Sequence, residues 1–93
     1  MPYYVYILVS EVDGTLYMGQ TEDLKGRFRR HNKGLVQTTR NHAPYKLGYF
    51  EVVESRSEAM WREWELKKKW NTQRKKKLVD KFDQSLVDAL LRQ

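Results

Sequence analysis

The chain has 93 residues, of which 40% are hydrophobic and 32% are charged, so it has enough apolar side chains to bury one modest core. The absence of cysteine excludes disulfide bonds and thiolate metal sites, and no apolar run approaches the length of a membrane span. The net charge of +6 favours a polyanionic partner such as nucleic acid over a membrane. We therefore expect a single domain spanning residues 1–93 and a cytoplasmic location.

The first half of the chain predicts a β-hairpin followed by a helix. Residues 3–9 are apolar at both odd and even positions and are rich in β-branched and aromatic side chains. This pattern is typical of a strand covered on both faces. An Asp-Gly pair at 13–14 predicts a two-residue turn into a second strand at residues 15–20. Thr21 is the expected cap of a helix that ends near Gly34, because glycine readily adopts the left-handed conformation.

The second half adds one strand and two helices. Residues 45–53 predict the third strand, and Ser55 with Glu58 forms a capping box that opens a helix running to about Trp70. A further helix carries apolar residues at fourfold spacing, namely Leu78, Phe82, Leu86 and Leu90. The order β-β-α-β-α-α predicts an α/β fold in which a three-stranded antiparallel sheet is flanked by three helices.

The predicted hairpin brings two tyrosines to the same face of the sheet. With a two-residue turn, Ser10 lies opposite Tyr17 and Leu8 lies opposite Gly19. Tyr6 and Tyr17 then share a face, because side chains alternate along a strand. Gly19 would leave a gap beside the two phenols and so shape any site there. Strand tyrosines usually belong to a core with a wetted hydroxyl, and a notch beside two phenols is equally consistent with a site.

Polar side chains occupy helix positions where apolar ones are expected. At about 100° per residue, Arg27 and His31 lie beside the buried stripe of the first helix. Glu63 projects from the apolar stripe of the second helix, and an ionised carboxylate is costly to bury without a cation. A structural ion pair between Glu63 and Arg27 would explain both residues. Convergence of these side chains with the two phenols would instead suit phosphoryl transfer.

Several short motifs resemble those of the GIY-YIG nucleases, and in particular their small, stand-alone, single-domain branch. Residues 4–6 (YVY) and 17–19 (YMG) resemble the paired GIY and YIG elements. The helix that follows resembles the family pattern T-x-D-L-x-x-R-x-x-x-H-N through Thr21, Asp23, Leu24, Arg27, His31 and Asn32. The pattern Ala59-x-x-x-Glu63-x-x-x-Lys67 resembles the segment that contributes the family's metal-binding Glu.

The resemblance implies a metal-dependent endonuclease that hydrolyses phosphodiester bonds in DNA, including structured or branched DNA, with a role in DNA repair. It implies one Mg²⁺ or Mn²⁺ ion bound by Glu63, and an Arg27 guanidinium that contacts a nonbridging phosphate oxygen. It further implies that Tyr6 or Tyr17 orients and deprotonates the attacking water. His31 is our candidate for helping to move that proton.

The sequence departs from the family pattern at three points, of which the change at Tyr4 and the late Asn favour an alternative, while Met18 preserves an apolar side chain. Tyr4 replaces the Gly of GIY, Met18 replaces the Ile of YIG, and the late Asn of the family has Asn71 as its candidate counterpart. The alternative is a catalytically silent or weakly active nucleic-acid-binding module of the same fold.

Basic residues indicate where nucleic acid would bind. The candidate phosphate contacts are Arg40, Lys67, Lys68, Arg74 and Lys75. A solvated charged face is the competing interpretation. We expect Trp61 and Trp64 to pack against the third helix, with base stacking as the less favoured use. Because no separate DNA-binding domain is evident, target specificity would come from this domain or from a protein partner.

Overall fold

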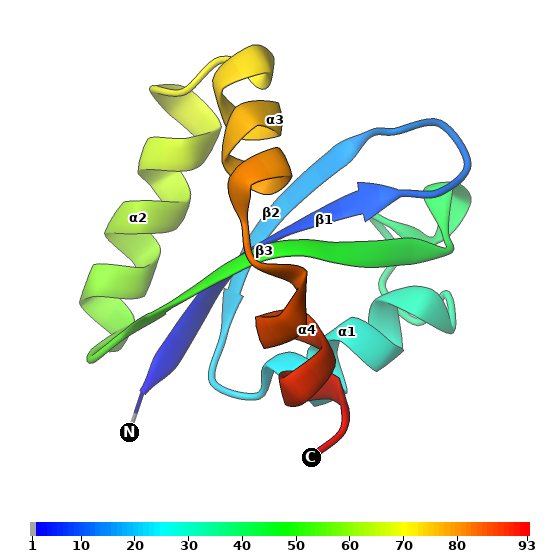
Figure 1. The fold of residues 1–93 in the computed structure, drawn as a ribbon, viewed down its shortest axis with the longest axis horizontal. Coiled ribbons are helices and arrows are strands. Elements are labelled where there is room, and N and C mark those ends of the chain that lie inside the picture. The colour runs from blue at the N-terminus through cyan, green and yellow to red at the C-terminus, as the bar shows by residue number, and fades with distance from the viewer. Residues whose placement is uncertain (1) are drawn as a thin grey trace.

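The structure is a computed structural model that describes residues 2–93, and it confirms the predicted fold class (Figure 1). Three antiparallel strands form one sheet in the order β2-β1-β3, with helices on both faces. In chain order the elements are β1 (Tyr3–Ser10), β2 (Leu16–Thr21), α1 (Leu24–Asn32), the 3₁₀ turn η1 (Arg40–His42), β3 (Tyr45–Val53), α2 (Arg56–Lys68), α3 (Thr72–Lys81) and α4 (Gln84–Leu91). Within residues 2–93, no helix combines the length and the apolar composition needed to cross a membrane.

The sheet separates two hydrophobic cores, and its central strand β1 contributes to both. Tyr6 and Leu8 pack with residues of α1 and α4 on one face, whereas Val5 and Ile7 pack with residues of α2 and α3 on the other. These four residues are each no more than 1% exposed. The prediction of a strand covered on both faces is therefore confirmed, and Figure 1 shows the two helix pairs on opposite sides of the sheet.

The third helix of the prediction is two helices, which is a correction. At Phe82 the backbone becomes extended, and Asp83 then caps α4 by accepting a hydrogen bond from the Ser85 amide at 2.9 Å. The break carries the chain across the sheet: Val79 of α3 packs in one core and Val87 of α4 in the other. The fourfold spacing of apolar residues in the sequence does not reveal this crossing, because a helix packed against either core has an apolar side.

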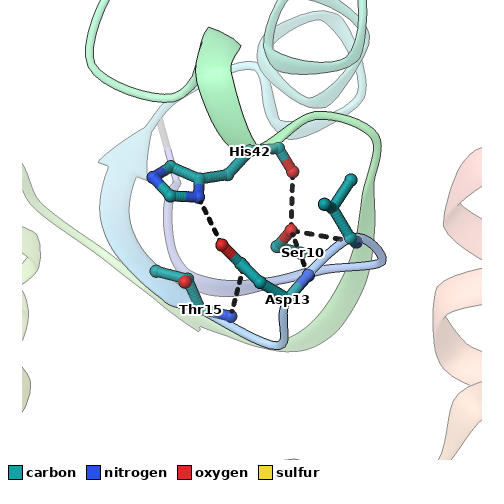
Figure 2. A network of polar contacts seen from close by, with 5 residues as sticks. Ser10, Asp13, Thr15 and His42 are labelled. Atoms are coloured by element: carbon teal, nitrogen blue, oxygen red, sulfur yellow. Dashed lines mark hydrogen bonds and ion pairs between the residues drawn. The ribbon is translucent and has the colours of Figure 1, made fainter.

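The hairpin loop is longer than the predicted two-residue turn, so the pairing of β1 with β2 shifts by two residues. The Ser10 amide donates to the Thr15 carbonyl at 2.9 Å, and Tyr6 lies opposite Gly19 in place of Leu8. Figure 2 shows the cause: the side chains of Ser10 and Asp13 accept hydrogen bonds from backbone amides of the loop. Ser10 Oγ accepts from the Asp13 amide at 3.3 Å, and Asp13 Oδ1 accepts from the Thr15 amide at 3.0 Å. A shift of two keeps every side chain on its predicted face.

A contact between side chains ties this loop to the turn η1. Asp13 Oδ2 lies 2.7 Å from His42 Nδ1, and Ser10 Oγ donates to the His42 carbonyl at 2.6 Å (Figure 2). Hydrogen bonds from Thr15, followed by the contact with His42, hold the pKa of the Asp13 carboxyl well below its usual range. The hairpin end and η1 therefore form one hydrogen-bonded unit.

The helix ends follow local rules, with one correction. The cap of α1 is Asp23 and not Thr21: Asp23 Oδ1 accepts from the Gly26 amide at 3.1 Å, while Thr21 ends β2. The end of α1 near Gly34 is as predicted, since Gly34 has φ of +74°. Ser55 caps α2 by accepting from the Glu58 amide at 3.2 Å, as predicted.

A glycine in β3 allows α3 to lie close to the sheet. A Cβ atom at Gly48 would be 2.9 Å from Val79 Cγ1 and 2.9 Å from Val9 Cγ2. Neither valine can move easily, because both belong to the core beneath α3. The close approach of β3 to α3 therefore requires glycine at this position.

We expect Gly48→Ala to lower the free energy of unfolding by about 1–3 kcal/mol, because the added methyl overpacks this core. Urea unfolding followed by circular dichroism measures the change. Val79→Ala is the matched partner variant, since it removes two of the methyl groups that the new Cβ would meet. The double variant should be more stable than the sum of the single effects predicts, by about 0.5 kcal/mol or more. Strict additivity would contradict the proposed contact.

Candidate active site

The predicted notch at Gly19 is filled by the ring of Tyr6. A Cβ atom at Gly19 would lie 2.5 Å from Tyr6 Oη and 2.6 Å from Tyr6 Cζ. The Tyr6 ring therefore crosses the backbone of β2, which is the outer strand of the sheet on this side. Gly19 thus places the Tyr6 hydroxyl near the free edge of β2.

The Tyr6 hydroxyl begins a buried chain of three side chains. It lies 3.0 Å from His31 Nε2, and His31 Nδ1 lies 2.7 Å from Thr39 Oγ1. Thr39 uses its only proton to donate to the Val36 carbonyl at 3.3 Å, so its oxygen accepts from His31 Nδ1. With a proton on Nδ1, a neutral His31 presents a lone pair at Nε2. These hydrogen bonds therefore assign the Tyr6 hydroxyl as the donor to His31.

Burial keeps both ends of the Tyr6–His31 hydrogen bond neutral. Burial, with a smaller contribution from the positive charges of Arg27 and Arg30, lowers the pKa of His31 to about 4. Burial also raises the pKa of Tyr6 to about 12, against the opposing effect of the Arg27 guanidinium and with smaller increases from Tyr17 and Glu63. Near neutral pH the pair is thus a phenol and a neutral imidazole.

Tyr17 lies beside this pair and is more accessible. Its ring centroid is 4.9 Å from that of His31 and 6.4 Å from that of Tyr6. Tyr17 is partly exposed, whereas Tyr6 is 1% exposed. The two predicted phenols therefore share one face of the sheet and one aromatic cluster.

Arg27 contributes a buried hydrogen-bond donor that has no acceptor. Its Nε atom is buried and makes no hydrogen bond to any residue in the range 2–93. The structural ion pair with Glu63 that the sequence left open is not formed within this range. A buried N–H without an acceptor is costly, so this position suits an anionic ligand.

Glu63 belongs to α2, which contacts the same outer strand β2 from the opposite face of the sheet. It lies on α2 between the buried residues Ala59 and Leu66, and its side chain is 23% exposed. Its Oε2 accepts from Lys67 Nζ at 2.7 Å. Its charge contributes to the raised pKa of Tyr6, which indicates that the carboxylate is within electrostatic reach of the phenol. Helices α1 and α2 cover different faces of the sheet, and both contact β2.

The donor set fits only one kind of metal ion. Within residues 2–93 no three His, Asp or Glu side chains come together. A single partly exposed carboxylate is sufficient for a hard cation such as Mg²⁺, which keeps most of its water ligands when bound to proteins. Glu63 is therefore compatible with one largely hydrated divalent ion.

A basic depression of about 500 Å³ lies along α1 and includes Arg27 in its lining. Its other positively charged residues are Arg29, Arg30 and Lys33. Sequence reasoning assigned no role to these three residues. Their spacing places all three on one exposed side of the helix, and this pattern could have identified them as candidate phosphate contacts from the sequence.

The predicted phosphate contacts divide into exposed residues and one buried one. Arg40, Lys67 and Lys68 are exposed, and so is Arg74, whose guanidinium lies 3.6 Å from the ring centroid of Trp70. Lys75 differs from these residues, because it is 8% exposed. It precedes Val79 by one helical turn and so faces the sheet, where burial lowers the pKa of its ammonium group.

The positions of Trp61 and Trp64 are a correction. They were expected to pack against the third helix, but they are 63% and 40% exposed. The buried side of α2 is formed by Ala59 and Leu66, and both tryptophans fall outside that stripe. The sheet and α3 thus leave the outer side of α2 uncovered.

Other motif residues have structural roles. Asn32 Nδ2 donates to the Tyr45 carbonyl at 3.1 Å, and its Oδ1 accepts from the Tyr45 amide at 2.6 Å, which ties α1 to β3. Asn71 caps α3 by accepting from the Arg74 amide at 2.8 Å. Sequence reasoning missed Thr39, because the loop that carries it has no periodicity.

Comparisons with known proteins identify the family of the chain. Residues 2–77 match the family described as the GIY-YIG catalytic domain. A UPF0213 protein of Clostridium perfringens is 46% identical over 66 residues, which cover 70% of each chain. A UPF0213 protein of Staphylococcus saprophyticus is 37% identical over 78 residues, covering 83% of this chain and 93% of that protein.

A solved structure extends the likeness to the fold. The solution NMR structure of a UPF0213 protein from Bacillus halodurans is 36% identical and has a TM-score of 0.54. The match covers 86% of this chain and 84% of that chain. The resemblance seen in the sequence motifs is confirmed. The chain belongs to the GIY-YIG family, within which it is similar to the small UPF0213 proteins.

Proposed function

We propose that this protein is a nuclease that hydrolyses phosphodiester bonds in DNA at the site formed by Tyr6, Tyr17, Arg27, His31 and Glu63. The observation that carries the proposal is the buried Nε of Arg27, which has no acceptor within residues 2–93. A nonbridging phosphate oxygen would supply that acceptor, and the guanidinium would stabilise the negative charge that grows there in the transition state.

The Tyr6–His31 hydrogen bond supports a concerted movement of two protons. His31 is 0% exposed, so it reaches a water molecule only through Tyr6. As the water oxygen bonds to phosphorus, its proton passes to Tyr6 Oη while the Tyr6 proton passes to His31 Nε2. The bond to the 3′ oxygen breaks, and that oxygen takes a proton from solvent. Concerted transfer avoids a free phenolate, which a pKa of about 12 disfavours near neutral pH.

Tyr17 and Thr39 would position the groups between which the protons of this relay move. Tyr17 is the more exposed phenol, and its hydroxyl is available to orient the attacking water. Thr39 accepts from His31 Nδ1 and so keeps the Nε2 lone pair directed at Tyr6. Thr39 is therefore a positioning residue, whereas Tyr6 and His31 carry the proton.

Glu63 would hold one Mg²⁺ or Mn²⁺ ion at the edge of β2. When bound, such an ion supplies positive charge to the phosphate and to the departing oxygen. Lys67, which pairs with Glu63 in the structure, would then be free to contact the DNA backbone.

The basic depression beside Arg27 would hold the DNA backbone. Arg29, Arg30 and Lys33 line it, and the exposed predicted contacts Arg40, Lys68 and Arg74 would add further phosphate contacts. Phosphate contacts position DNA without reading its sequence, so target specificity would come from other features of this domain or from a protein partner.

A silent binding module of the same fold is the second candidate function. Two observations favour it: Tyr6 is 1% exposed, and Glu63 is already paired with Lys67. Such a module would bind DNA and show no cleavage of single-stranded, duplex or branched substrates with Mg²⁺ or Mn²⁺.

We expect Glu63→Gln to lower the cleavage rate by roughly 100-fold or more, because it removes the negative charge that binds the metal ion. Arg27→Lys keeps the positive charge but loses the planar set of donors, and we expect a loss of roughly 10- to 100-fold. Gel assays with Mn²⁺ on single-stranded, duplex and branched DNA measure both effects.

Glu54→Gln is the matched control, because Glu54 is an exposed carboxylate just ahead of the same helix. It should cleave at the wild-type rate, and circular dichroism should show that all variants are folded. Wild-type cleavage by Glu63→Gln would refute the proposed role of Glu63. Binding without cleavage by the wild-type protein on every substrate would favour the silent module.

The buried histidine predicts a specific pH dependence. Between its ordinary pKa of 6.5 and the folded value of about 4, the unfolded chain binds a proton at His31 and the folded protein does not. The contribution of neutral His31 to stability is therefore full above pH 6.5 and decreases as the pH falls toward 4, by about 3 kcal/mol in total.

NMR titration of His42→Gln, which leaves one histidine, checks this shift. We expect the His31 ring resonances to stay constant down to about pH 5 and to shift only toward pH 4. Because the relay needs neutral His31, the cleavage rate should likewise show no decrease centred near pH 6.5. A His31 titration midpoint near 6.5 would contradict both expectations.

A further inference from the structure

The outer side of α2 carries an apolar surface that the fold leaves uncovered. Met60, Trp61 and Trp64 are 53%, 63% and 40% exposed, although all three are large and apolar. Together with Ser57 they line a shallow depression of about 440 Å³. Contiguous exposed apolar residues of this kind mark interaction sites, because leaving them in water has a cost that a folded protein usually avoids.

The two tryptophans in this surface are already stacked on each other. Their ring centroids are 5.1 Å apart, and the planes of the rings are 28° from parallel. Such a pair presents a flat aromatic face on which a further flat ring can stack. Nucleobases are flat rings with this property, and stacking on tryptophan tolerates any base because every base has a π face.

The surrounding charges favour a polyanion over a second copy of the chain. Lys69 Nζ lies 5.5 Å from the centroid of the Trp64 ring, and the exposed Lys67 and Lys68 belong to the same end of α2. The whole chain has a net charge of +6, which opposes self-association and attracts a phosphate backbone. An aromatic face beside lysines is the combination found where single-stranded nucleic acid binds.

The position of the aromatic pair relates it to the proposed catalytic site. Met60 precedes Glu63 by three residues and is therefore its neighbour on the helix surface, whereas Trp64 directly follows Glu63 and points about 100° around the helix from it. A strand whose phosphate lies at Glu63 would have its adjacent nucleotides within reach of α2. In a duplex the bases are stacked inside the helix, so only unpaired bases could use this surface.

We infer that Trp61 and Trp64 form a stacking site for unpaired bases of single-stranded DNA, next to the scissile phosphate. The binding site stands on the exposed aromatic pair and its lysines, and its placement next to a scissile phosphate rests on the proposed function. The substrate of this protein is then DNA with unpaired nucleotides beside the cleaved bond, either fully single-stranded or at a branch.

Binding measured without divalent ions tests the site separately from cleavage. The probe is a short oligothymidylate, compared with a duplex of equal length, both titrated in EDTA and followed by fluorescence anisotropy of a dye on the DNA. We expect Trp61→Ala and Trp64→Ala each to weaken binding of the single strand by roughly 5- to 150-fold. Duplex binding should change by less than about twofold, since it depends on phosphate contacts.

Conservative variants separate base stacking from apolar docking. Trp61→Phe keeps an aromatic face and should retain most of the affinity for the single strand, whereas Trp61→Leu keeps the apolar area without that face and should not. Leu86→Ala is the matched control, because Leu86 is 49% exposed on α4, which covers the other face of the sheet. It should bind like the wild-type protein.

Other occupants of this surface give distinct outcomes. Equal weakening of single-strand and duplex binding, or no weakening, would overturn the stacking site. A wild-type dimer in sedimentation that Trp61→Ala converts to a monomer would assign the surface to a second copy. Binding that depends on Trp61 in a protein that cleaves no DNA would uphold the site and refute the nuclease. Cleavage and single-strand binding that are both insensitive to the two tryptophan substitutions would refute the stacking site and leave the nuclease in place.

Discussion

The close approach of the Tyr6 ring to Gly19 is the constraint on which the rest of the site depends. Because Gly19 has no side chain, the ring crosses the outer strand β2 and brings its hydroxyl to the edge of the sheet. There the hydroxyl meets His31 from α1, while α2, which carries Glu63, covers the opposite face of the sheet. Any larger residue in place of Gly19 would force the ring of Tyr6 to move.

The burial that organises the Tyr6–His31 pair also determines its chemistry. Low solvent access disfavours both charged forms, so a single proton is shared across a hydrogen bond between neutral groups. Thr39 has no other proton to offer, which sets the tautomer of His31. Arg27 adds an N–H that lacks an acceptor among residues 2–93, and a protein tolerates that cost most readily where a ligand binds. These features together support phosphate chemistry better than a purely structural core.

Three sides of helix α2 carry three different groups of residues. Its inner side, with Ala59 and Leu66, completes the core beneath the sheet. Its edge carries Glu63 toward β2, and its outer side carries the stacked tryptophans. A rigid helix keeps the spacing between a carboxylate and an aromatic surface constant, which favours functional groups placed on helices over groups placed on loops.

The sequence by itself determined the features that depend on local periodicity: the doubly covered strand β1, the shared sheet face of Tyr6 and Tyr17, and the end of α1 at Gly34. Alternation along a strand and the backbone freedom of glycine are properties of a short segment, so they can be read without a fold. Only the tertiary structure decided the hairpin register, the crossing between α3 and α4, the burial of Lys75, the exposure of Trp61 and the role of Thr39. Each of these depends on contacts between segments far apart in the chain, and no pattern within one segment specifies its distant neighbours.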